Sequence, residues 1–190
     1  ANKNGALLIF DEIVTGFRAG MGGAQSRYGV TPDLASFGKA LGNGMPISAV
    51  VGRADVMDLM EEIFFSATFG GEALSLAAAI ATLDKLENQN GVPRMEETSV
   101  RLAASVAEIF QSQKLDQHYA ISGPDWWKRI TPIPQARVDG VTLTSLIRQE
   151  YIKNGLLMMS SFNMCLAHCN TAVEDIVISK FRNVAASLQE

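Results

Sequence analysis

Three polar side chains in the first part of the chain are of types that could do chemistry together. The first, Asp11, follows an apolar run at residues 6–10 that predicts a short strand buried on both faces of a parallel sheet. Open α/β sheets bind ligands at the carboxyl ends of such strands, so a carboxylate here could pair with a cation. An aspartate at a strand end can equally cap a turn or a helix.

The second side chain is Lys39, which stands in an apolar stretch directly after a strand predicted for residues 34–37. This position predicts a buried amine. Burial favours the neutral form of an amine, which can form an imine with a carbonyl compound. The alternative is a lysine whose aliphatic stem lies on apolar surface while its ammonium group reaches water.

The third side chain is Thr68, in a segment of hydroxyl and glycine residues at 66–71 that leads into a helix predicted for residues 72–87. A hydroxyl and free backbone N–H groups at the start of a helix form a phosphate site. An ordinary helix cap with a glycine-rich approach has the same sequence pattern.

The elements that must position these residues fall into two parts. Strands at 6–10, 34–37 and 47–51 and the helix at 72–87 predict a parallel-sheet unit over residues 1–90. A break at residues 91–93 begins a smaller α/β unit over residues 91–190. It contains helices at about 94–113 and 142–154, a strand pair within 118–133, and a last helix that opens with a capping box of Thr171 and Glu174. In the helix at 142–154, one apolar stripe is predicted for Leu143, Leu146, Ile147 and Tyr151.

Composition excludes several classes of protein. Apolar residues make up 47% of the 190 residues, which is enough for a folded core. The formal charge of −4, without a basic stripe, argues against nucleic acid or an anionic membrane as partner. No apolar run approaches the roughly 20 residues that span a bilayer. Two cysteines do not make a disulfide framework, which predicts a cytoplasmic location. A first residue other than Met, so close to a predicted strand, suggests that a part is missing upstream.

Three motifs resemble one enzyme family, the class III aminotransferases. Residues 11–18 (DEIVTGFR) resemble its acidic strand-end motif, residues 38–47 (GKALGNGMPI) its lysine segment, and residues 68–71 (TFGG) its phosphate-contact segment. The separations also fit, with 28 residues from Asp11 to Lys39 and 29 from Lys39 to Thr68. The resemblance is specific to about residue 86 and looser beyond it.

The resemblance implies an α/β fold of the pyridoxal-phosphate (PLP) transferase type I kind. Residues 1–90 would be the later part of its PLP-binding large domain, with its parallel or mixed sheet, and residues 91–190 its small α+β C-terminal domain. Lys39 would hold the cofactor as a Schiff base and shuttle a proton, Asp11 would pair with the pyridine nitrogen, and Ile13 would pack on the ring. Thr68 would contact the cofactor phosphate in a neighbouring subunit, which implies a homodimer.

The implied reaction is amino transfer from a small-molecule amine donor to a carbonyl acceptor. Val14 stands where many transaminases carry Gln, and residues 161–169 lack the arginine that clamps a substrate carboxylate. Both features are compatible with an intramolecular aminomutase of the glutamate-1-semialdehyde kind.

The family's phosphate-gripping loop and stacking aromatic residue, which precede the first strand, are absent, so a non-catalytic remnant that only dimerises or packs against a partner stays a third reading. Cys165, His168 and Cys169 match no common zinc spacing, so no metal is predicted.

Overall fold

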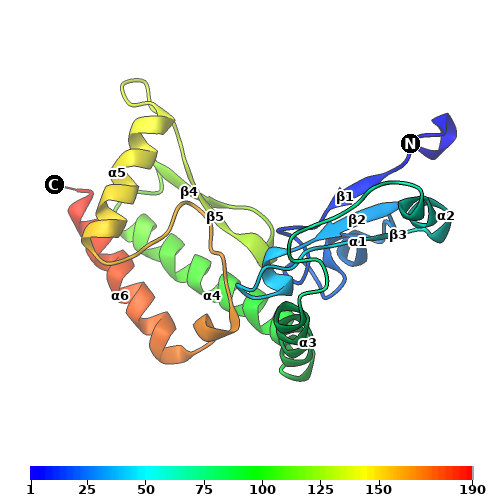
Figure 1. The fold of residues 1–190 in the computed structure, drawn as a ribbon. Helices are drawn as coiled ribbons and strands as arrows, with labels where there is room; N and C mark the ends of the chain where they lie inside the picture. Colours follow the sequence, from blue (N-terminus) through cyan, green and yellow to red (C-terminus); the bar gives the residue numbers. More distant parts are fainter. Residues whose placement is uncertain (190) are drawn as a thin grey trace. The chain divides into compact units, whose positions relative to one another are not determined.

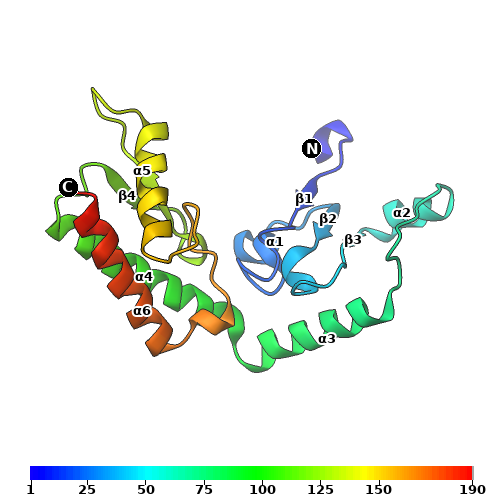
Figure 2. The same ribbon diagram turned by 60° about the vertical axis from the view of Figure 1, so that its left-hand side comes forward.

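A computed structural model describes residues 1–189, and it divides the chain into two compact units, Ala1–Val92 and Pro93–Glu190 (Figures 1 and 2). The boundary lies two residues after the predicted one. That the first unit is part of a PLP-binding large domain and the second a C-terminal small domain stays a prediction.

The first unit is built on a mixed sheet of three strands in the order β1-β2-β3 (Figure 1). Strand β1 (Ile9–Asp11) runs parallel to β2 (Leu34–Phe37), and β2 runs antiparallel to β3 (Ala49–Gly52). All three strands were predicted from their apolar runs. The other elements of the unit are η1 (Asn2–Asn4), α1 (Gly23–Tyr28), η2 (Lys39–Leu41), α2 (Ala54–Met57), η3 (Asp58–Glu61) and α3 (Ala73–Asn88).

The first strand is not buried on both faces, so that prediction is wrong. Ile9 keeps 61% of its surface exposed and Leu7 keeps 47%. A strand face is buried only where another element packs on it, and the buried residues of this unit's core come from β2, η2 and α3. The core of this unit is correspondingly small and consists of Ala35, Phe37, Leu41 and Ala79, with partly buried side chains around them.

The break between the first two long helices lies slightly earlier than predicted. Helix α3 ends at Asn88, and Asn90 takes a left-handed backbone with φ of 50°. Helix α4 (Gly91–Ser112) then begins inside the segment that was expected to separate the helices. Pro93 lies in the first turn of α4, where a missing N–H interrupts no helical hydrogen bond.

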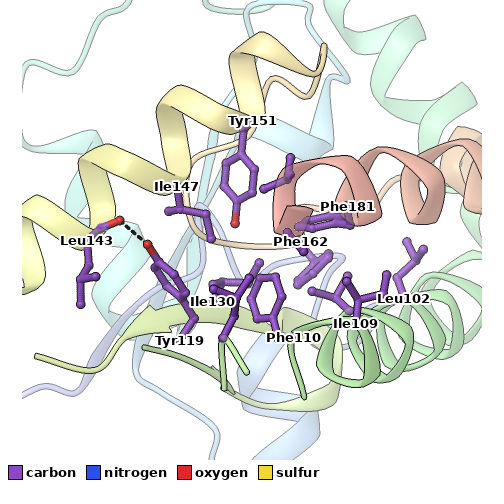
Figure 3. Close-up of a cluster of buried hydrophobic side chains, with 14 of the residues drawn as sticks. Leu102, Ile109, Phe110, Tyr119, Ile130, Leu143, Ile147, Tyr151, Phe162 and Phe181 are labelled. Carbon is purple, nitrogen blue, oxygen red and sulfur yellow. Dashed lines mark hydrogen bonds between the residues drawn. The ribbon is translucent and has the colours of Figure 1, made fainter. Parts of the chain in front are cut away.

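The second unit packs α4, α5 (Gly140–Lys153) and α6 (Thr171–Ser187) with an antiparallel pair of β4 (Tyr119–Ser122) and β5 (Arg129–Pro132). Two short helices, η4 (Asp125–Trp127) and η5 (Leu166–His168), lie in its loops. Figure 3 shows the buried core between these elements, in which aromatic rings from α4, α5 and α6 meet. The ring centroids of Phe110 and Phe181 are 6.5 Å apart, and those of Tyr151 and Phe181 are 5.6 Å apart.

Two details of the predicted helices in this unit are wrong. Leu146 was expected inside but keeps 44% of its surface exposed, because only the other members of its stripe face the core. The last helix is capped by Asn170, whose side chain accepts the Ala172 N–H at 2.9 Å, rather than by a capping box of Thr171 and Glu174. The Glu174 carboxylate instead pairs with Arg101 of α4 at 2.8 Å.

Candidate active site

The structure brings Asp11 and Lys39 to the same edge of the sheet. Asp11 is the last residue of β1 and pairs in register with Ser36 of β2. Lys39 begins η2, two residues after β2 ends at Phe37. Because β1 and β2 are parallel neighbours, about 4.8 Å apart, their carboxyl ends lie side by side. The carboxylate and the amine, far apart in sequence, therefore stand on adjacent strand ends.

Ile13 connects these two positions. The Asp11 carboxylate accepts the Ile13 N–H at 3.0 Å, which fixes the backbone directly after the strand. A Cβ added to the buried Gly38 would lie 3.0 Å from Ile13 Cδ1, so the isoleucine side chain packs against the backbone that carries Lys39. A larger residue at position 38 would push Ile13 aside.

Glu12 is a positioning residue that was not singled out from the sequence. Its side chain is 1% exposed, and its carboxylate accepts the N–H groups of Ala24 at 2.8 Å and Gln25 at 2.9 Å. It also accepts the hydroxyl of Thr15. The carboxylate thus ties the start of α1 to the end of β1 and closes the loop that begins with Ile13. The only local signal for this role is the glycine at position 23, where φ is +76° and a Cβ would meet the carboxylate.

Lys39 is exposed, so the expectation of a buried amine is wrong for this chain. Its φ of 43° lies in the left-handed region, which turns the chain sharply out of β2 into η2. The apolar neighbours that suggested burial do face inward, and Leu41 belongs to the core. The turn places the lysine on the opposite side from them.

Thr68 lies apart from Asp11, Ile13 and Lys39. It is exposed and lines a hollow of about 570 Å³ whose walls, formed by residues within 46–48 and 65–76, include neither Asp11 nor Lys39. The start of α3 is not free for an anion either, because the Glu72 carboxylate accepts the N–H groups of Leu74 at 2.9 Å and Ser75 at 2.7 Å. The hydroxyl of Ser75 and these N–H groups hold the pKa of Glu72 below its ordinary value. The N–H groups at this helix start are therefore taken by Glu72, and contact of the Thr68 hydroxyl with a cofactor phosphate stays a prediction.

Within residues 1–189, no group of three His, Cys, Asp or Glu side chains could hold a metal ion. In the same part of the chain, no helix is both long and apolar enough to cross a membrane.

Comparison with known proteins decides the family. Residues 1–120 match the family model for class III aminotransferases. The chain belongs to this family. A glutamate-1-semialdehyde 2,1-aminomutase of Archaeoglobus fulgidus is 30% identical over 92% of the chain, and one of Cenarchaeum symbiosum is 33% identical over 98%. These alignments cover 44% and 46% of the two relatives, so the chain spans less than half of their length.

Solved structures agree on the fold. An ornithine aminotransferase of Toxoplasma gondii superposes on 99% of this aminotransferase-family chain with a TM-score of 0.83 and 26% identity, and the match covers 45% of that protein. A transaminase with bound PLP superposes with the same TM-score at 20% identity. The predicted type I α/β fold is confirmed. PLP, the predicted cofactor, is the cofactor of the family.

The residues at the sheet edge fit the ring and the carbonyl group of PLP. The exposed carboxylate of Asp11 can face a protonated ring nitrogen, the apolar side chain of Ile13 can cover a ring face, and the exposed amine of Lys39 can reach a carbonyl carbon. These three lie at one sheet edge. The phosphate end has only Thr68 as a candidate, in a different hollow of the same unit.

Proposed function

We propose that the protein is a PLP-dependent aminotransferase in which Lys39 holds the cofactor. The observation that supports this proposal is the placement of Asp11 and Lys39 on the carboxyl ends of adjacent parallel strands. When bound, PLP supplies an electron sink for the bond that is broken at the substrate's amine-bearing carbon.

In this proposal each side chain has a defined role. Asp11 keeps a proton on the pyridine nitrogen by placing a negative charge beside it. Lys39 would hold the cofactor through Nζ, and its amine would move a proton at the amine-bearing carbon of the substrate. Ile13 holds one ring face and excludes water from it. Thr68 donates its hydroxyl to the cofactor phosphate of a second subunit.

The partners follow from the same assignment. The substrates are a small-molecule amine donor and a carbonyl acceptor, and the working unit is a homodimer because Thr68 does not share a hollow with Lys39 in its own chain. We place the protein in the cytoplasm. Neither nucleic acid nor a membrane is a partner in this proposal.

A second candidate is an intramolecular aminomutase of the glutamate-1-semialdehyde kind. The names of the relatives from Archaeoglobus fulgidus and Cenarchaeum symbiosum favour it, and the absence of arginine from residues 161–169 is compatible with it. Without an arginine there, this segment offers no bidentate partner for a substrate carboxylate. An apolar residue at Val14 points in the same direction.

The assignment of Lys39 can be tested by reductive labelling. PLP is added to the protein, borohydride fixes any imine, and the digest with trypsin is analysed by mass. A cofactor on Lys39 blocks cleavage there, so the label is expected on one peptide that runs from Tyr28 to Arg53. Because PLP also reacts with ordinary surface lysines, the expected result is selective labelling of this peptide over those that contain Lys3 or Lys85.

Three variants complete the test. Lys39→Ala should abolish the selective label, and Asp11→Asn should reduce its yield at limiting PLP because the ring nitrogen loses its anionic partner. Lys85→Ala, which changes an exposed lysine of α3, should leave the label on residues 28–53 unchanged. Label spread evenly over the exposed lysines, in the parent and in Lys39→Ala alike, would contradict the proposal and favour the non-catalytic remnant.

Turnover separates the two enzyme candidates. An aminotransferase needs both an amine and an added keto acid. An aminomutase converts glutamate 1-semialdehyde with no added acceptor, because both groups are on one substrate. The measurement is product formation from each substrate set by the same PLP-loaded protein.

A further inference from the structure

A thiol cluster in the second unit is formed by residues that have no role in the proposed PLP chemistry. Cys165, His168 and Cys169 surround the short helix η5 (Leu166–His168). Cys165 Sγ lies 3.4 Å from His168 Nδ1, and the Cys165 N–H donates to the same Nδ1 at 3.1 Å. Cys169 Sγ lies 3.7 Å from the Cys165 carbonyl oxygen. One turn of chain therefore gathers two thiols and an imidazole.

The orientation of the imidazole is set by the backbone. Because Nδ1 accepts the Cys165 N–H, the neutral ring carries its proton on Nε2, and the Nδ1 lone pair faces the Cys165 thiol as well. The Cys165 side chain in turn accepts the backbone N–H of His168, so the two side chains cap the turn reciprocally. The same arrangement places the His168 Nδ1, a proton acceptor, beside the Cys165 thiol, a nucleophile.

Both thiols are free and the first is open to solvent. Cys165 is exposed and Cys169 is partly exposed. Next to them, Met164 and His168 line an apolar hollow of about 320 Å³. A small oxidant can reach Cys165 directly. The Cys169 thiol lies against the backbone of Cys165, so it is positioned to react with an oxidised form of the Cys165 sulfur.

We propose that Cys165, His168 and Cys169 form a peroxide-responsive thiol pair. His168 Nδ1 gives up the hydrogen bond from the Cys165 N–H and takes the proton of Cys165 Sγ, and the thiolate attacks the outer oxygen of a hydroperoxide. The O–O bond breaks, the sulfur is oxidised to a sulfenic acid, and the departing oxygen leaves as water or an alcohol with the proton from His168. The Cys169 thiol then attacks the sulfenic sulfur, which forms the disulfide and releases water. In sum, two thiols and one hydroperoxide give one disulfide, one water, and one alcohol or second water.

The chain offers a direct readout. Both cysteines lie on one tryptic peptide, residues 154–180, because no lysine or arginine stands between Lys153 and Lys180. After treatment of the folded protein with hydrogen peroxide and blocking of free thiols, this peptide should be lighter by two hydrogen atoms. A thiol reductant should restore it.

Three variants separate the steps. Cys169→Ser should stop at the sulfenic acid, which dimedone traps on residue 165. Cys165→Ser should leave Cys169 reduced under the same treatment. His168→Asn retains a side-chain oxygen that can accept the Cys165 N–H but cannot take a proton, and it should slow oxidation about tenfold or more. Circular dichroism of each variant checks that the unit is folded.

Several outcomes would overturn the proposal. One is oxidation of His168→Asn at the parent rate, and another is equal, independent oxidation of the two cysteines in the single variants. Disulfides that join two chains, seen as doubled mass without reductant, would also overturn it. None of these readouts depends on PLP, so the thiol proposal and the aminotransferase proposal fail separately.

Discussion

Two tyrosines in the core of the second unit give opposite expectations for the same substitution. Tyr119 and Tyr151 are both buried, with 4% and 0% of their surface exposed (Figure 3). The Tyr119 hydroxyl donates to the carbonyl oxygen of Leu143 at 2.9 Å. The Tyr151 hydroxyl has no hydrogen-bond partner within residues 1–189. Burial raises the pKa of Tyr119 to about 12 and raises that of Tyr151 further, so both phenols stay neutral.

The magnitudes follow from these contacts. A buried polar group without a partner costs about 1–3 kcal/mol, and Tyr151→Phe removes it. The substitution leaves a cavity the size of one oxygen atom, which costs roughly 0.3 kcal/mol at about 24 cal/mol per Å³ and offsets part of this gain. Tyr151→Phe should therefore stabilise the unit by about 1 kcal/mol or slightly more. Tyr119→Phe loses a satisfied hydrogen bond and should destabilise the unit by about 0.5–1.5 kcal/mol.

Tryptophan fluorescence reports on this unit alone. The two tryptophans of the chain, Trp126 and Trp127, both lie in the second unit, so urea unfolding followed by their emission measures its stability. With a urea dependence of about 2 kcal/mol per molar, the two midpoints should move about 0.5 M in opposite directions. If Tyr151→Phe unfolded at lower urea than the parent, its hydroxyl would have a partner and the argument would be refuted.

Three further substitutions test the sheet edge of the first unit. Glu12→Gln should lower the protection of the α1 amides from hydrogen exchange by about tenfold, because hydrogen bonds to a carboxylate are worth about 1.5–3 kcal/mol. The pKa of Asp33 is held below its ordinary 3.8, first by the Leu8 N–H and then by Arg53. This carboxylate therefore stabilises the fold above pH 3.8 and loses that contribution as the pH falls through its lower folded pKa, and Asp33→Asn should flatten the acid part of a stability profile. Gly38→Ala should displace Ile13, whose Cδ1 would lie 3.0 Å from the new methyl group, and should lower the PLP label on Lys39.

The sequence predicted the elements that rest on local patterns. Apolar runs bounded by glycine or proline located β2 and β3, and an apolar stripe located most of the buried face of α5, where Leu143, Ile147 and Tyr151 are buried. These patterns are sufficient because a strand or a helix face is encoded by residues close in sequence. The sequence also placed Asp11 and Lys39 on two successive strands, and the parallel pairing of those strands brings them to one edge.

The failures involve partners that are distant in the chain. Glu12 caps a helix that begins eleven residues later, and no local pattern links the two positions. At the last helix, Asn170 and Thr171 are both residues that cap helices well, and Glu174 could not complete a box because Arg101 holds it. Arg101 stands more than seventy residues earlier, so only the fold could reveal the competition.

The exposure of Asp11 and Lys39 has the same origin and bears on the proposed chemistry. An apolar neighbourhood in sequence indicates that the chain around a residue is buried, but the residue itself is buried only if another element covers the sheet edge. In water, opposite charges about 4 Å apart attract by about 1 kcal/mol, and at an effective dielectric of 20 by about 4 kcal/mol. Before the cost of desolvating the two charges, covering the edge would therefore strengthen the attraction between Asp11 and a cationic ring by about 3 kcal/mol. Strand ends bring the two groups together, and the surface that closes over them sets how tightly the cofactor binds.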